Sequence, residues 1–128
     1  MKYFLLVFSI IFFFFAKAQV VNSFSFNING TPPAGFTQAL NIAAQKWSTY
    51  LQINVPVKVN IFTVNSPLLP FSAITLANGR KNFNNAPYPN VIYTTALANQ
   101  LAGVQTNPGE FDMDIYFNLN TAYYYGIG

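Results

Sequence analysis

The chain contains only three acidic residues, and they stand at alternate positions: Glu110, Asp112 and Asp114. In an extended strand, alternate side chains share one face about 7 Å apart, so such carboxylates could bind calcium or catalyse glycoside hydrolysis. Calcium usually takes six or more oxygen ligands, and Asn107 and Asn118 are the nearest additional donors. The alternative, which we favour, is a half-exposed strand whose acids keep the sheet edge soluble.

Histidine and cysteine, on which most hydrolytic and redox chemistry depends, are both absent from the sequence. These two residue types supply nearly all zinc ligands in proteins, and a serine or threonine nucleophile would have no histidine base. A lysine base is conceivable, but Lys46 and Lys58 fall on predicted polar faces where nothing would activate them. We therefore assign no catalytic residue and no zinc ligand to this chain, and expect it to be inert on its own.

Residues 1–18 have the pattern of a secretory signal peptide. Lys2 supplies the positive start, residues 3–15 are apolar except for Ser9, and residues 16–18 form an Ala-Lys-Ala cleavage site. An uncleaved anchor is the alternative, but the apolar run is shorter than the roughly 20 residues that a membrane span needs. We therefore expect residues 19–128 to be secreted, extracellular or periplasmic, without a stable membrane anchor after cleavage.

Signal cleavage also changes the charge of the chain, because Lys2 and Lys17 leave with the signal peptide. The remainder holds four basic residues against three acids, a net charge of +1. Nucleic-acid binding needs a dense basic surface that releases counterions from phosphates, so we expect no nucleic-acid partner. The absence of cysteine means that the apolar core alone must hold the secreted domain together.

The residue pattern in the N-terminal half of the sequence predicts a strand, a helix and a second strand. Phe24, Phe26 and Ile28 alternate with polar residues, and the Asn29-Gly30 turn follows. Residues 36–51 repeat apolar side chains with helical spacing, and we expect the single tryptophan, Trp47, to anchor this helix in the core. A second alternating strand runs over residues 57–61. This order predicts a parallel strand pair with the helix crossing one face of the sheet.

The C-terminal half predicts a short strand at residues 71–77, a surface loop at 78–89, a short helix and a final strand. Thr94 or Thr95 could begin the helix, and Gly103 follows its end. The final strand covers residues 110–117, with one apolar face and one mostly acidic face. Residues 19–128 are thus predicted to form one α+β domain, a mixed twisted sheet backed by one long amphipathic helix.

The order of these segments resembles the N-terminal half of secreted zincin metallopeptidases, bacterial families related to the metzincins. The resemblance rests on a strand ending near Ile28, Ala43, Ala44 and Trp47 in an Ala-Ala-x-x-Trp helix, a strand over residues 55–61, and Asp114-Ile-Tyr-Phe-Asn. In this family a tyrosine- and glycine-rich segment, like residues 123–126, precedes a His-Glu-x-x-His helix that supplies two zinc ligands and the general base. The resemblance implies a subdomain truncated at its C-terminus.

Under this hypothesis the full-length parent is a zinc-dependent hydrolase acting on a peptide or protein substrate, and this chain is its fragment. A complete secreted carbohydrate- or peptide-binding module is the alternative, because the surface is rich in asparagine and aromatic residues. A complete module should fold cooperatively as a monomer, whereas a fragment should expose apolar surface. The product of a degenerate gene is a further alternative.

Overall fold

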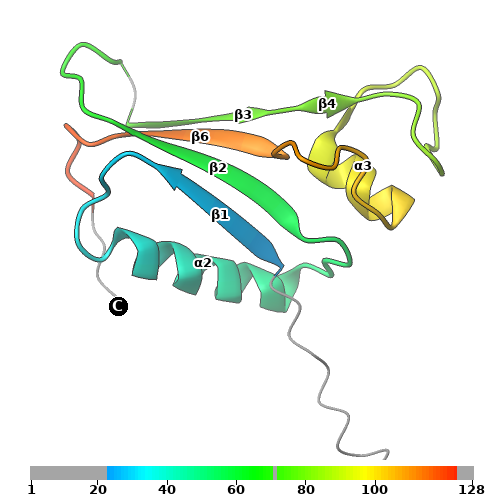
Figure 1. Cartoon of the computed structure of the whole chain (residues 1–128), viewed down its shortest axis with the longest axis horizontal. Helices are drawn as coiled ribbons and strands as arrows, with labels where there is room; N and C mark the ends of the chain where they lie inside the picture. The colour runs from blue at the N-terminus through cyan, green and yellow to red at the C-terminus, as the bar shows by residue number, and fades with distance from the viewer. Residues whose placement is uncertain (1–22, 71, 124–128) are drawn as a thin grey trace, which may run out of the picture.

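The computed structural model describes residues 23–70 and 72–123, which form a mixed four-stranded sheet, a two-stranded ribbon and two α-helices (Figure 1). The predicted α+β class is therefore confirmed, while the predicted signal peptide and residues 124–126 lie outside the described residues. No helix in the described part is long and apolar enough to cross a membrane. The elements, in chain order, are β1 (Phe24–Asn29), α2 (Phe36–Tyr50), β2 (Val57–Val64), β3 (Ala73–Ala77), β4 (Gly79–Arg80), β5 (Tyr93–Thr94), α3 (Thr95–Ala102) and β6 (Met113–Asn118).

The main sheet has the strand order β1-β2-β6-β3. The first three strands are parallel, with Ile28 of β1 opposite Ile61 of β2 and Ile61 opposite Ile115 of β6. The fourth strand, β3, runs antiparallel to β6 at the sheet edge. The predicted parallel pairing of β1 and β2, two strands connected through α2, is thus confirmed. Strand β6 could not be placed from periodicity, because its position next to β2 depends on contacts between distant segments.

The core lies on one face of this sheet. The alternation in β2 buries Val57, Val59 and Ile61, and Phe36 from the start of α2 is also buried against them. The ring of Phe36 meets that of Phe117 edge to face, with the ring centres 5.0 Å apart. Such aromatic contacts add about 0.5–1.5 kcal/mol to the apolar burial. The first turn of α2 is thereby fixed against β2 and β6.

Helix α2 forms as predicted, but it does not back the sheet along its length (Figure 1). Phe36 is its only buried residue, and Leu40 contributes a partly buried side chain. Trp47 is 57% exposed, so its prediction as a core anchor was wrong. Ala44 and Ser48, which follow Leu40 at intervals of four residues, line the cleft beside β1. Trp47 lies off that row, toward solvent.

Helix α3 is held to the sheet by side-chain amides. Its C-terminal end follows the prediction, since Gly103 adopts a left-handed conformation with φ of 71°. Near that end, the Gln100 side chain pairs with the backbone of the segment entering β2. Its Nε2 donates to the Val55 carbonyl oxygen at 2.5 Å, and its Oε1 accepts from the backbone N–H groups of Asn54 and Val55 at 2.8 and 3.1 Å. The Gln105 side chain donates to the Pro56 carbonyl oxygen at 2.7 Å.

Candidate functional site

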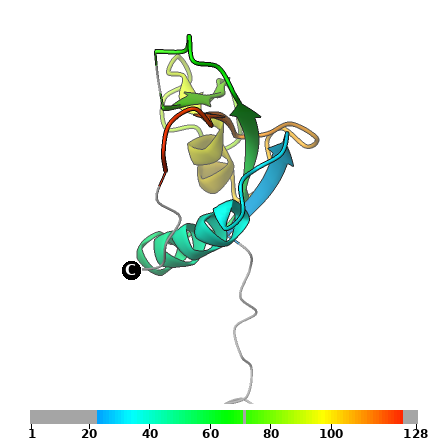
Figure 2. The ribbon, with the colours of Figure 1, turned by 90° about the vertical axis from the view of Figure 1, so that its left-hand side faces the viewer.

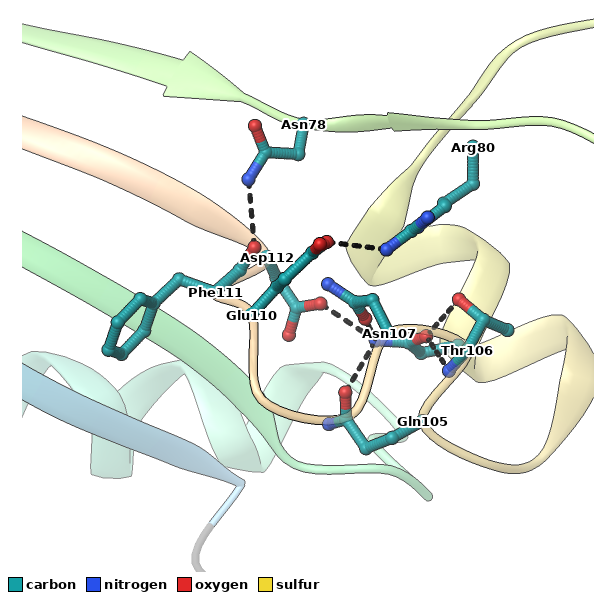
Figure 3. Close-up of polar contacts among 9 residues, drawn as sticks. Asn78, Arg80, Gln105, Thr106, Asn107, Glu110, Phe111 and Asp112 are labelled. Atoms are coloured by element: carbon teal, nitrogen blue, oxygen red, sulfur yellow. Dashed lines mark hydrogen bonds and ion pairs between the residues drawn. The ribbon is translucent and has the colours of Figure 1, made fainter.

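The main polar cluster of the described residues surrounds Asp112, just before β6 (Figure 3). The sequence predicted this carboxylate on a half-exposed acidic face, but Asp112 is only 1% exposed. One carboxylate oxygen accepts a hydrogen bond from the backbone N–H of Lys58 at 2.7 Å, and the other accepts from Asn99 Nδ2 at 2.7 Å. Asp112 therefore ties β2 and α3 to the start of β6.

Asn99, on α3, is the second centre of this cluster. Besides Asp112, its Nδ2 donates to Gln105 Oε1 at 2.9 Å and lies 3.4 Å from Asn107 Oδ1. Its Oδ1 accepts from both the backbone N–H and the hydroxyl of Thr106, at 2.7 and 2.6 Å. The loop between α3 and β6 is thus folded around one buried amide. Figure 3 shows these side chains converging between α3 and the start of β6.

The three acids have different partners, so the predicted acidic face does not exist as one surface. Glu110 is exposed and pairs with Arg80 of β4, with 2.5 Å between the guanidinium and carboxylate groups. Asp114 lies on the opposite face of the sheet from the core, where its Oδ1 accepts from Asn60 Nδ2 at 3.1 Å. In the described residues, no three acidic, histidine or cysteine side chains group together in a way that could hold a metal ion.

The two asparagines considered as additional calcium ligands are also separated. Asn107 is buried beside Asn99, whereas Asn118 lies at the far end of β6 and exchanges hydrogen bonds with the backbone of Ser66. Asn118 follows Asp112 by six positions along the chain, which corresponds to about 20 Å of extended strand. Zinc does not fit this donor set either, because the chain offers neither histidine nor cysteine. The candidate calcium ligands Glu110, Asp112 and Asp114 thus lack a common centre in the described structure.

Burial dominates the electrostatics of Asp112. Desolvation raises the pKa of its carboxyl group, while the hydrogen bond from the Lys58 backbone, the positive charge of Lys58 and the hydrogen bond from Asn99 act in the opposite direction. Two buried polar atoms nearby, Thr95 Oγ1 and Asn107 Nδ2, have no hydrogen-bond partner. The free-energy cost of burying Asp112 therefore depends on its protonation, and it is larger for the charged form.

The stability of the chain should accordingly depend on pH through Asp112. Its pKa is raised in the folded state, so the folded chain binds more protons than the unfolded chain between the two pKa values. The free energy of unfolding should therefore fall as pH rises from about 4 through the folded-state pKa. Urea unfolding across this pH range measures the effect. In Asp112→Asn the fall should disappear, and an unchanged profile would contradict this assignment.

The face of the sheet opposite the core carries a ladder of amides that periodicity did not identify. Asn27 of β1 donates to Asn60 Oδ1 at 2.9 Å, Asn29 donates to the same oxygen at 2.7 Å, and Asn60 donates to Asp114. In the next row, the rings of Phe62 and Tyr116 stack with their centres 4.7 Å apart. The ladder exists because the register places Asn27, Asn60 and Asp114 side by side on three strands.

The geometry assigns a structural role to the Asp112 cluster, because both carboxylate oxygens are bonded to donors from the chain itself. The ladder and its neighbouring rings lie on the face of the sheet opposite the core. The chain matches no protein-family model, no curated protein and no solved structure.

Proposed function

We propose that this chain is the scaffold portion of a secreted zinc-dependent peptidase of the zincin type. The residues present do not fit zinc, so the metal ligands and the general base of such an enzyme would lie outside these 128 residues. In this proposal the chain itself is inert. It contributes the sheet and α2 as a rigid support for a catalytic segment.

The observation that carries this proposal is the incomplete burial of the apolar side of β6. Met113, Ile115 and Phe117 point toward the core face, yet all three remain partly exposed. Helix α2 contributes Phe36 and the partly buried Leu40 to this core, and its later residues are not part of it. A further amphipathic helix packed against β6 would bury these side chains at about 25 cal/mol per Å² of apolar surface. The order of strand, helix, strand and Asp-Ile strand supports the same proposal.

Transcript sequencing across codon 128 in the source organism tests this proposal. We expect the open reading frame to continue and to encode a His-Glu-x-x-His segment shortly afterwards. A stop codon followed by an unrelated gene would overturn the proposal. Peptide cleavage by the purified 128-residue chain, abolished by a chelator, would also overturn it, because that result would locate the catalytic residues within this chain.

A second candidate function, carbohydrate binding by a secreted module, is favoured by the uncovered outer face. There the Asn27–Asn60–Asp114 ladder lies beside the Phe62–Tyr116 stack, and Ile74 of β3, opposite Tyr116, is 39% exposed. Planar amides can bond to sugar hydroxyls while aromatic rings contact the apolar face of the sugar. Co-sedimentation with insoluble cellulose and chitin tests this candidate. Retention that Tyr116→Ala abolishes would support it, and equal retention of both proteins would refute it.

A further inference from the structure

Strand β1 forms an open edge of the sheet beside α2 (Figures 1 and 2). Among the described residues it pairs only with β2. The backbone N–H of Val57 donates to the Ser23 carbonyl oxygen at 3.0 Å, so Ser23 faces β2. Successive residues of a strand alternate in direction, and the backbone groups of Phe24, Phe26 and Ile28 therefore face away from β2. Each of these residues offers one donor and one acceptor along the open edge.

A cleft of about 970 Å³ lies along this edge, between β1 and α2. It falls within the range of about 300–1,000 Å³ typical of ligand sites. Phe24, Phe26 and Ile28 of β1 line one wall, and Leu40 and Ala44 of α2 contribute apolar surface to the other. The cleft extends along α2 from Thr37 to Thr49. The cleft therefore lies beside the backbone groups of β1 that face away from β2.

The lining of the cleft indicates the chemistry of its occupant. None of the lining residues carries a charge, and those of α2 include the short polar residues Thr37, Asn41 and Ser48. A charged ligand would find no counter-ion there. A row of backbone donors and acceptors repeating every two residues, about 7 Å, instead matches the backbone of another extended chain.

We propose that the open edge of β1 accepts an uncharged, extended peptide segment as an additional strand in the cleft. The added strand would direct alternate small apolar side chains toward Leu40 and Ala44, and its other side chains toward solvent. It would continue the sheet beyond β1, with main-chain hydrogen bonds supplying affinity and the α2 wall supplying selectivity. This inference is independent of the peptidase and carbohydrate proposals, because it uses neither β6 nor the outer-face ladder.

Amide hydrogen exchange measured by NMR on the full chain tests the inference directly. The probe is an acetylated, amidated peptide of alternating threonine and valine, equal in length to the six residues of β1. Binding should slow exchange at Phe24, Phe26 and Ile28 by about tenfold or more, while Ser25 and Asn27, already bonded to β2, change little. The same peptide with alternate nitrogens methylated should give no protection. Unchanged exchange at saturating probe would overturn the proposal.

A pair of tryptophan variants tests the position of the added strand. Ala44 lines the cleft and Ala43, its neighbour on α2, is exposed and does not. Ala44→Trp should fill the cleft and weaken peptide affinity by about tenfold or more, whereas Ala43→Trp should leave it unchanged. Circular dichroism establishes that both variants are folded. Equal peptide affinities of the two variants would overturn the proposal. It would also be overturned if, without peptide, the three β1 amides became protected as protein concentration rises, because the occupant would then be a second copy of the chain.

Discussion

Replacement of Asp112 by alanine is expected to lower the free energy of unfolding by about 3 kcal/mol. The change removes the acceptor of two buried donors, the Lys58 backbone N–H and Asn99 Nδ2. A buried N–H left without an acceptor costs about 1–3 kcal/mol, and the Asn99 amide keeps one bond, to Gln105 Oε1. Loss of the carboxylate also removes its own desolvation penalty, which offsets part of that cost. Urea denaturation at neutral pH measures the change.

Two further variants separate the effect of Asp112 from the general loss of a negative charge. Glu110→Ala removes an acid two residues away, but this carboxylate is exposed and bonded only to Arg80, so the loss should stay below about 1 kcal/mol. Asp112→Asn keeps one acceptor oxygen and turns an N–H₂ group toward a donor, so we expect an intermediate loss. Similar values for Asp112→Ala and Glu110→Ala would show that the buried cluster does not stabilise the fold.

Gly30→Ala is expected to cost about 3 kcal/mol, because two independent penalties coincide there. Gly30 follows β1 with φ of 102°, a conformation that residues with a Cβ atom rarely adopt. A Cβ atom at this position would overlap Thr63 Oγ1 and lie 3.1 Å from the Thr63 carbonyl oxygen. The hydroxyl cannot move freely, because it donates to the Asn29 carbonyl oxygen at 3.2 Å. Thermal unfolding followed by circular dichroism checks this expectation.

Gly109→Ala is the matched control for the backbone contribution. Gly109 also has a positive φ, 93°, but a Cβ atom there would meet nothing within 4 Å. Its replacement should therefore cost only the conformational penalty, about 1–2 kcal/mol. Thr63→Ala in combination with Gly30→Ala should recover part of the steric cost, giving a measurable coupling between the two sites. Equal losses in the two glycine variants would refute the steric explanation.

Local patterns predicted most of the elements. Alternation identified β1, β2 and β6, and the apolar repeat identified α2, because both signals arise from residues close in sequence. The error concerned packing: residues 36–51 carry an apolar repeat, and only tertiary contacts decide how much of it is buried against the sheet. Trp47 was assigned to the core because it lies on the apolar repeat, yet the structure leaves it 57% exposed. Strand order likewise depends on pairing between distant segments and could not be read from periodicity.

The polar sites were harder to predict than the fold. Asp112 lies in an alternating acidic pattern, so the sequence favoured exposure, and its burial depends on Asn99 arriving from α3. One signal was available in retrospect, since Thr95 and Asn99 stand four residues apart and share one face of α3 with the small residue Ala98. The Asn27–Asn60–Asp114 ladder needs the register of three strands at once, and no local pattern encodes that register.

Helix α3 is attached to the sheet through Asn99 and Gln100, and the loop after it through Gln105, whereas the Leu97 and Leu101 side chains of the helix stay substantially exposed. Amide hydrogen bonds exchange readily with water, so their net contribution is small compared with that of apolar burial. Helix α3 and the loop after it should therefore unfold locally while β1, β2 and β6 remain paired. Proteolytic nicking under native conditions should accordingly begin between residues 95 and 110.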